Sequence, residues 1–304
     1  MKIVTYSAQG RELLGVVQDS KVVDVLTLAQ AAGIAATAFA SMLDFLRGGD
    51  AALGTLRDLL GRKDAVANAA TYPLDQAQLC APIPNPSKIV AVGLNYREHC
   101  TEQGIKAPEE PLLFAKFPNS VTGPFDPIVI PEENPEVDYE VELGVVIGRR
   151  AKRVAEADAF NHIAGYLVLN DVSARKWQFA DKQWTRGKSC DTFCPIGPWL
   201  TTTDEVPNPE ALAVMTRVNG EVLQESSTAN LIFGIAKLIS YISASITLEP
   251  GDVIATGTPP GVGCFRNPPI YLKPGDHVEI SVEGLGALNN PVVAEREWSH
   301  AVGR

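Results

Sequence analysis

The sequence predicts an α+β fold: a mixed β-sandwich or roll with few helices, preceded by a small α+β domain. After residue 88, most apolar segments are short and alternate with polar residues, as β-strands do. Two Pro-Gly-Asp turns, at 250–252 and 274–276, each precede such a segment. Strands and helices do not alternate regularly, which argues against a doubly wound sheet or a TIM barrel.

Residues 1–75 are expected to form the small α+β domain. Its apolar and polar residues predict three short strands followed by three helices. The strands are expected at Lys2–Tyr6, Leu13–Gln18 and Lys21–Asp24, and the helices around Leu26–Ala32, Phe39–Leu46 and Ala51–Leu60. Residues 76–87 contain Pro82, Pro84 and Pro86 and are interpreted as an extended linker, since proline disfavours helix.

Residues 88–304 are expected to form the larger domain. A buried strand is predicted at 88–94 and another at Ile163–Leu169, and Asn219-Gly220 predicts a hairpin turn. Helices are expected around Ala155–His162, Ser173–Ala180 and Ile232–Ser243.

The composition excludes several classes of partner. The net charge of −10 argues against a nucleic-acid partner or an anionic membrane surface. No segment approaches the roughly 20 apolar residues of a membrane span. The five cysteines form no CxxC pair and no signal peptide is evident, so we expect reduced, buried and inert thiols and a cytoplasmic location.

The segment VDYEVELGVVIG (137–148) places three acidic residues on one face of a predicted strand: Asp138, Glu140 and Glu142. A solvated sheet face would explain them. However, the strand continues as a fully apolar GVVIG, as interior strands do. Buried carboxylates at its start would need cations or a metal ion to balance them.

A further acid, Asp171, follows the apolar strand 163–169. It could be a helix N-cap. Alternatively, Asp171 joins Glu140 and Glu142 in a site for a hard divalent cation such as Mg²⁺, which prefers oxygen ligands. No Cys/His cluster has zinc-site spacing.

His99 and Glu102 lie three residues apart, on one face if this segment is helical. They could be an ordinary surface pair, or an acid–base pair, because imidazole titrates near neutral pH. Arg175 and Gln178 share the same spacing, and Lys188 lies in a glycine-containing loop; each could be a plain surface residue. Three carboxylates with one divalent ion would keep a negative charge, so an anionic substrate would need such cations.

The segment GTPPGVG (257–263) is not a nucleotide-binding loop, because it lacks Gly-Lys-Ser/Thr and the GxGxxG spacing. Its glycines and prolines more plausibly fix a tight loop whose amides and Thr258 face a carboxylate.

Six segments together resemble the fumarylacetoacetate hydrolase (FAH) family over about residues 88–293. They occur in the family's order: GLNYREHCTEQG, DYEVELGVVIG, NDVSARKWQ, RGKSCDTFCPIGPW, RVNGEVLQ and PGDVIATGTPPGVG. The sequence is most similar to the smaller members, which have acylpyruvase, oxaloacetate decarboxylase or tautomerase, or hydroxydienedioate isomerase activity. The resemblance implies an FAH C-terminal-like fold for residues 88–304 and, as in many members, a homodimer.

The resemblance also implies roles for individual residues. Glu140, Glu142 and Asp171 would bind Mg²⁺ or Mn²⁺, and Asp138 would be a surface group or lie behind the ligands. His99 and Glu102 would form a catalytic dyad on a lid helix. The substrate pocket would contain Arg175, Gln178, Lys188, which is also catalytic, and Thr258. The full-length animal hydrolase has one more acidic ligand, for which this sequence shows no counterpart.

These residues imply a metal-dependent enzyme that acts on a small 2-oxo acid. We expect C–C bond hydrolysis of an acylpyruvate or fumarylpyruvate, in which His99 activates water and a pyruvate enolate is the leaving fragment. Oxaloacetate decarboxylation or tautomerisation, or hydroxydienedioate isomerisation, would use the same enolate. Residues 102–116 and 177–184, which would shape the far end of the pocket, should decide between them. A metal- or metabolite-binding protein without turnover is the alternative from another class.

Overall fold

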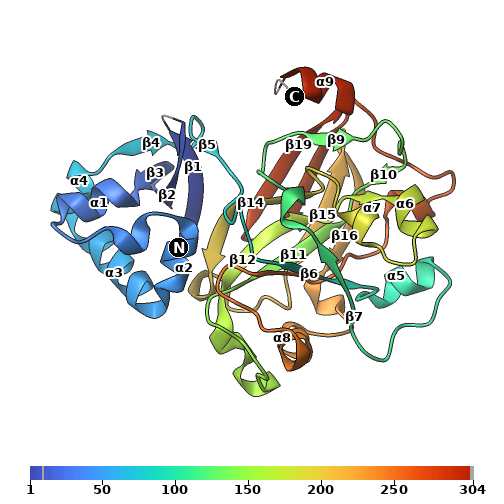
Figure 1. The fold of residues 1–304 in the computed structure, drawn as a ribbon, viewed down its shortest axis with the longest axis horizontal. Coiled ribbons are helices and arrows are strands. Elements are labelled where there is room, and N and C mark those ends of the chain that lie inside the picture. The colour runs from blue at the N-terminus through green and yellow to red at the C-terminus, as the bar shows by residue number, and fades with distance from the viewer. Residues whose placement is uncertain (9, 302–304) are drawn as a thin grey trace.

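The structure is a computed structural model that describes residues 1–8 and 10–301 (Figure 1). It confirms a mixed α+β fold with large sheets and few helices. The path of the 12-stranded sheet runs β4-β3-β2-β1-β14-β12-β11-β17-β6-β7, and a five-stranded sheet has the order β16-β15-β18-β19-β9. Among the described residues, no helix is long and apolar enough to cross a membrane.

The N-terminal unit, at the left of Figure 1, has strands on one side and four helices on the other. Its strands are β1 (Lys2–Ala8), β2 (Arg11–Gln18), β3 (Lys21–Asp24), β4 (Thr71–Pro73) and β5 (Gln78–Leu79). Its helices are α1 (Val25–Ala31), α2 (Met42–Arg47), α3 (Gly49–Gly61) and α4 (Lys63–Asn68). β1 also pairs with a strand of the larger unit, so one sheet continues through both.

The single helix expected at 39–46 is wrong. Residues Thr37–Phe39 form a 3₁₀ turn and α2 begins at Met42. Ser41 separates them, because its φ of −152° is extended and its side chain accepts a hydrogen bond from the Asp44 amide at 3.1 Å, as an N-cap does. The predicted linker is extended, and its β5 pairs with β1.

The larger unit supplies the remaining strands of the big sheet and the whole five-stranded sheet. The big sheet receives β6 (Ile89–Gly93), β7 (Leu112–Lys116), β8 (Val121–Thr122), β11 (Val141–Ile147), β12 (Ile163–Asn170), β14 (Cys194–Thr202) and β17 (Val253–Ala255). The other sheet has β9 (Ile128–Ile130), β15 (Ala213–Val218), β16 (Glu221–Ser227), β18 (His277–Val282) and β19 (Gly286–Ala294). β10 (Val137–Asp138) pairs with β13 (Ser173–Ala174).

The predicted hairpin turn is confirmed, because Asn219 and Gly220 connect β15 to β16 with φ of 53° and 85°. Both values are positive, as a two-residue hairpin turn of the mirror-image type requires.

The α-helices of this unit are α5 (Arg97–Glu102), α6 (Arg175–Ala180), α7 (Thr185–Lys188), α8 (Ile235–Ser245) and α9 (Glu295–Ala301). Three expected helices differ from the structure. The segment Glu156–His162 is a 3₁₀ helix, and Ser173–Ala174 belong to β13, so α6 begins at Arg175. α8 begins three residues late because the backbone of its N-cap, Gly234, is extended, with φ of −69° and ψ of 167°. The amides of Ile232 and Phe233, before it, donate to Asn95.

β11 is buried along its whole length and separates two cores. On one face, Leu143 and Val145 lie in a cluster with Ile280 of the five-stranded sheet. On the other, Val146 lies in a cluster with Leu56 of α3. A strand with a core on both sides must be apolar on both faces, which explains the GVVIG run.

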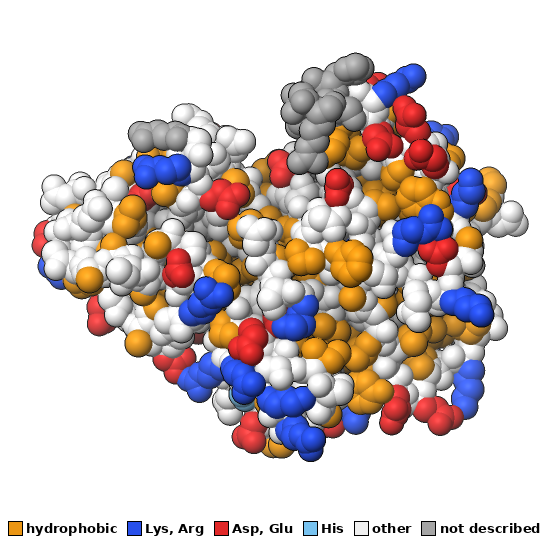
Figure 2. Space-filling model, in the orientation of Figure 1, with side chains coloured by type: hydrophobic (Ala, Val, Ile, Leu, Met, Phe, Trp, Pro, Cys, Tyr) orange, Lys and Arg blue, Asp and Glu red, His pale blue; other side chains and the backbone are white. Residues whose placement is uncertain are grey.

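The antiparallel pairing of β11 with β12 positions the site. Val141 lies opposite Asn170 and Glu142 opposite Leu169. The beginning of β11 and the end of β12 are therefore adjacent, which places residues 140–142 beside residue 171. On the face drawn in Figure 2, acidic and basic side chains are interspersed, and Lys and Arg gather near its lower edge. The acids at the junction of β11 and β12 are buried instead.

Candidate active site

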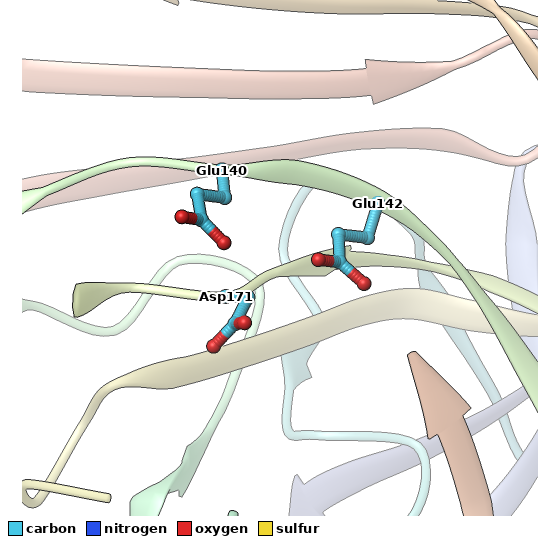
Figure 3. A group of neighbouring side chains, drawn as sticks. All are labelled: Glu140, Glu142 and Asp171. Atoms are coloured by element: carbon cyan, nitrogen blue, oxygen red, sulfur yellow. The ribbon is translucent and has the colours of Figure 1, made fainter. Parts of the chain in front are cut away.

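Glu140, Glu142 and Asp171 point toward one another at the junction of β11 and β12 (Figure 3). One carboxylate oxygen from each lies within 4.8 Å of the others. The three residues are 5%, 2% and 0% exposed. A solvated sheet face is therefore excluded for these glutamates. Asp171 is not an N-cap of α6 either, because that position is Ala174.

Backbone hydrogen bonds fix the two chain segments that carry the acids. The Glu140 amide donates to Asn170 Oδ1 at 3.0 Å, and the Asp171 amide donates to the Glu140 carbonyl at 2.9 Å. Glu140 and Asp171 thus have a fixed separation before any ligand binds.

Two cations predicted for the substrate pocket contact this acidic cluster directly. Lys188 Nζ lies 2.7 Å from Glu140 Oε2 and 2.8 Å from Asp171 Oδ2. Arg175 Nη2 lies 2.7 Å from Glu140 Oε1. Burial alone would raise the pKa of Glu140, but Lys188 and then Arg175 outweigh it and hold that pKa at about 2. Glu140 is therefore ionised at any physiological pH.

Lys188 is itself completely buried, which by itself would lower its pKa. The neighbouring Asp171 and Glu140 reverse this effect, so the pKa of Lys188 lies above its ordinary value. Lys188 is therefore a fixed positive charge in the cavity.

Lys116, which ends β7, lies in the range 102–116 that was expected to shape the pocket, but its contact with the acids was not predicted. Its Nζ lies 2.6 Å from Asp171 Oδ1 and 3.3 Å from the Val172 carbonyl, and it also donates to the Lys188 carbonyl. A lysine that ends an apolar strand (LLFAK) was a weak sequence signal. It became informative only when β7 was placed beside the acids.

Of the two positions expected for Asp138, the surface is wrong and the one behind the ligands is confirmed. Its side chain is inaccessible to solvent and accepts from Arg175 Nε at 2.9 Å and from the amides of Gly263 and Cys264 at 2.8 and 3.0 Å. Asp138 therefore lies behind the cluster, where it orients Arg175 and holds the 257–265 loop.

Glu142 lacks a cationic partner of this kind. Among the described residues it forms no ion pair, and its Oε2 accepts from the Gly257 amide at 2.7 Å. Burial raises the pKa of Glu142 well above its ordinary value, and the charges of Asp171 and Glu140 raise it further. An additional positive charge close to Glu142 would relieve this repulsion.

The donor set fits a hard divalent cation. Four buried carboxylates and three buried cations lie in mutual contact: Asp138, Glu140, Glu142, Asp171, Lys116, Arg175 and Lys188. With all of them ionised, one negative charge remains. Carboxylate oxygens are the ligands that Mg²⁺ and Mn²⁺ prefer, so Glu140, Glu142 and Asp171 could hold either ion.

The predicted acid–base pair is assembled on α5, which is helical as expected. His99 Nδ1 lies 2.9 Å from Glu102 Oε2, and the Gly261 amide donates to Glu102 Oε1 at 2.9 Å. The other ring nitrogen, His99 Nε2, lies 2.8 Å from Gln103 Nε2. The dyad is thus held on one side by the glycine-rich loop and contacts a glutamine on the other.

The remaining predicted pocket residues lie in the same place. Arg175 Nη1 donates to Gln178 Oε1 at 2.8 Å, so these two share one face of α6. Thr258 Oγ1 donates to the Val141 carbonyl at 2.9 Å and accepts from Gln224 Nε2 at 2.9 Å.

One cavity of about 80 Å³ connects these groups. It is lined by His99, Gln103, Glu140, Glu142, Asp171, Arg175, Gln178, Lys188 and Thr258, with Phe114, Phe179, Trp184 and Phe265 among its apolar walls. Glu102 does not line it and lies behind His99, which it contacts at 2.9 Å.

The five cysteines form no disulfide. Cys100 and Cys194 are buried as expected, whereas Cys80, Cys190 and Cys264 are only half-buried. Burial raises the pKa of Cys190 to about 11, which keeps its thiol protonated and unreactive.

The chain is similar to several known proteins. The oxaloacetate tautomerase FAHD2A, mitochondrial, of Bos taurus is 48% identical over 255 residues, which cover 83% of this chain and 80% of that protein. The structure of 2-hydroxyhepta-2,4-diene-1,7-dioate isomerase from Mycobacterium marinum matches with a TM-score of 0.74 and 33% identity, covering 97% of this chain and 99% of that one.

A further solved structure is that of maleylpyruvate hydrolase from Sphingobium sp. SYK-6, in complex with manganese(II) ion and pyruvate. It matches with a TM-score of 0.78 and 32% identity, over 97% of this chain and 99% of that one. The family model described as fumarylacetoacetate (FAA) hydrolase C-terminal matches residues 88–293. The chain therefore belongs to the fumarylacetoacetate hydrolase family.

Proposed function

We propose that this protein is a divalent-metal-dependent oxaloacetate tautomerase. The observation that carries the proposal is that His99, which is paired with Glu102, lines the same small cavity as a carboxylate cluster and two cations, Arg175 and Lys188. The 48% identity to the bovine oxaloacetate tautomerase favours this reaction over the acylpyruvate hydrolysis that the sequence suggested.

The metal site proposed here consists of Glu140, Glu142 and Asp171. A divalent ion held there would supply a Lewis acid that stabilises negative charge on an enolate oxygen. Mg²⁺ and Mn²⁺ both suit the all-oxygen donor set, and the maleylpyruvate hydrolase neighbour was solved with manganese.

The protein's own residues would bind and orient the substrate. Oxaloacetate is a dianion, and Arg175 and Lys188 are the cations that face the cavity. Gln178 positions the Arg175 guanidinium at 2.8 Å. Thr258 lines the cavity, and its hydroxyl would have to release the Val141 carbonyl to donate to a substrate carboxylate. Lys188 would also stabilise negative charge that develops in the transition state, because it is buried and its neighbouring carboxylates raise its pKa above the ordinary value.

The tautomerisation itself moves one proton between C3 and the 2-oxygen. Neutral His99 carries its proton on Nδ1, since Glu102 accepts there, and can receive another on Nε2. Taking the C3 proton leaves the electron pair as an enolate. Returning a proton to the oxygen gives the enol, so no water is consumed. Glu102 would stabilise the imidazolium between the two transfers.

The test is the rate of keto–enol interconversion of oxaloacetate, followed by ultraviolet absorbance, with and without Mg²⁺. We expect EDTA treatment and Glu140→Ala to abolish turnover, and Glu140→Ala also to abolish Mn²⁺ binding measured by calorimetry. Undiminished activity in metal-stripped protein would contradict the proposal. Binding of oxaloacetate without any turnover would instead support a metabolite-binding protein.

Acylpyruvate hydrolysis is the second candidate, because a maleylpyruvate hydrolase is among the structural neighbours. Comparing acetylpyruvate with oxaloacetate distinguishes the two, with NMR of the products. The homodimer implied by the family is also a proposal, and light scattering coupled to size exclusion would check it.

A further inference from the structure

Gln103 directly follows α5, and its amide reaches back one turn to the catalytic histidine. Its Nε2 lies 2.8 Å from His99 Nε2, and its backbone amide donates to the His99 carbonyl at 3.2 Å. With φ of −82° and ψ of −6°, Gln103 extends the helical backbone, so its side chain lies on the same face as His99. Gln103 also lines the cavity.

The chemistry of the partners fixes the direction of this contact. The Glu102 carboxylate can only accept, so His99 Nδ1 must carry the proton that lies between them. In the neutral ring, Nε2 is then a bare acceptor, and the amide of Gln103 donates to it. The nitrogen that would take up a proton during catalysis is therefore capped by a side chain of the same helix.

A water molecule that approaches this nitrogen meets the Gln103 amide, not a lack of space. The cavity measures about 80 Å³, which is enough for water, and the Phe265 ring lies 6.1 Å from the imidazole, centroid to centroid. A hydrolytic water would have to displace the Gln103 amide to reach Nε2. A substrate bound in the cavity can displace the Gln103 amide as the substrate's C3 approaches His99. A single water molecule must compete with that amide, which the adjoining helical turn holds in place.

We propose that Gln103 is a specificity-determining residue that keeps water from His99 Nε2, so that the site moves protons of a 2-oxo acid instead of hydrolysing a C–C bond. The inference rests on the proposed function, because it explains why a site of this composition would tautomerise rather than hydrolyse. Gln103 is a positioning residue: it acts through His99 and takes no part in the proton transfer.

The first test observes the contact directly, without reference to activity. The ¹⁵N NMR signal of His99 Nε2, in histidine-labelled protein, should move toward that of a free acceptor nitrogen in Gln103→Ala and Gln103→Leu. Thr101→Ala is the matched control, because Thr101 is exposed on the same helix and its hydroxyl donates to the Arg97 carbonyl. An unchanged signal in both glutamine variants would overturn the inference.

The second test compares two activities of the Mg²⁺-loaded protein. Gln103→Ala uncaps Nε2 and opens space for water. It should raise the ratio of acetylpyruvate hydrolysis to oxaloacetate tautomerisation about tenfold, a modest part of the roughly 10²–10⁴-fold contribution of a positioned base. The change should appear in kcat, with KM for acetylpyruvate nearly unchanged. Gln103→Leu uncaps the nitrogen but keeps the volume, so its ratio should rise less.

An unchanged or lower ratio in Gln103→Ala would overturn the inference and leave the proposed function intact. If the wild-type protein does not tautomerise oxaloacetate, the proposed function fails. The acetylpyruvate rate alone then decides the role of Gln103: a gain in Gln103→Ala supports it and no gain overturns it.

Discussion

Lys116 Nζ lies 2.6 Å from Asp171 Oδ1, and neither side chain is accessible to solvent. Removing one member of a buried ion pair leaves the other charge desolvated, which typically costs about 3–5 kcal/mol. Lys188 still contacts Asp171, so we expect Lys116→Met to lower the free energy of unfolding by about 3 kcal/mol, at the lower end of that range. Urea unfolding in EDTA measures this loss.

Lys106→Met is the matched control for this prediction. Lys106 lies 2.9 Å from Glu109, but both side chains are more than four-fifths exposed, at 83% and 84%. Exposed pairs of this kind contribute up to about 1 kcal/mol. Equal losses in the two variants would show that the Lys116–Asp171 contact is not buried as the structure has it.

Residues of the candidate site could be predicted where a chemically suitable residue type occurs in a recognisable local pattern. Glu140 and Glu142 alternate at the start of an apolar strand, and His99 and Glu102 have helical spacing, so each pair was predictable from its local pattern. Only the family resemblance placed the two pairs in one site. Lys116 could not be found in this way. It reaches Asp171 only because β7 joins the sheet edge beyond β6, a pairing that no local pattern specifies.

The position of Asp138 was also only partly predictable from the sequence. Its alternation with Glu140 was visible, but its burial depends on two amides of the loop at 263–264, which is distant in sequence. The fold class was predictable because turns and alternation are local. Exact helix starts were not, because they depend on the backbone conformation of single residues such as Gly234, whose extended conformation delays α8 to Ile235.

The raised pKa of Glu142 predicts how the stability of the metal-free protein changes with pH. An acid whose folded pKa exceeds its ordinary value of 4.5 binds more protons in the folded state. Its contribution to stability is therefore complete below that value and is lost as pH rises toward the folded pKa. We expect the unfolding temperature in EDTA to fall as pH increases above about 5, measured by calorimetry.

Glu142→Gln should remove this loss, because the amide cannot ionise and can still accept from the Gly257 amide. At pH 8 in EDTA, we expect the variant to unfold at least about 2 °C above the wild type, which corresponds to roughly 1 kcal/mol in a chain of this size. Mn²⁺ should stabilise the wild type more at pH 8 than at pH 5, and the variant far less. Glu221→Gln, at an exposed position, is the control. The same pH slope in wild type and Glu142→Gln would contradict the prediction.

Asp138→Asn tests whether the buried carboxylate positions Arg175 for substrate binding. The aspartate accepts from Arg175 Nε at 2.9 Å and from the Gly263 amide at 2.8 Å, while an asparagine must turn an NH₂ group toward one of these donors. Arg175 should then lose its fixed orientation. We expect kcat/KM for oxaloacetate to fall about 10- to 100-fold, mainly through a higher KM, because a hydrogen bond to a charged group contributes about 1.5–3 kcal/mol.

The measurement is steady-state kinetics of Asp138→Asn, with Asp181→Asn as the matched control. Asp181 pairs with Arg186 at 2.7 Å on the surface, so its variant loses a carboxylate–guanidinium contact outside the cavity. Its kinetic constants should stay within about twofold of the wild type, as expected for an exposed pair. A normal KM in Asp138→Asn with a lower kcat would assign Asp138 to the chemical step instead. That result would mean that Arg175 stabilises charge in the transition state rather than binding the ground-state substrate.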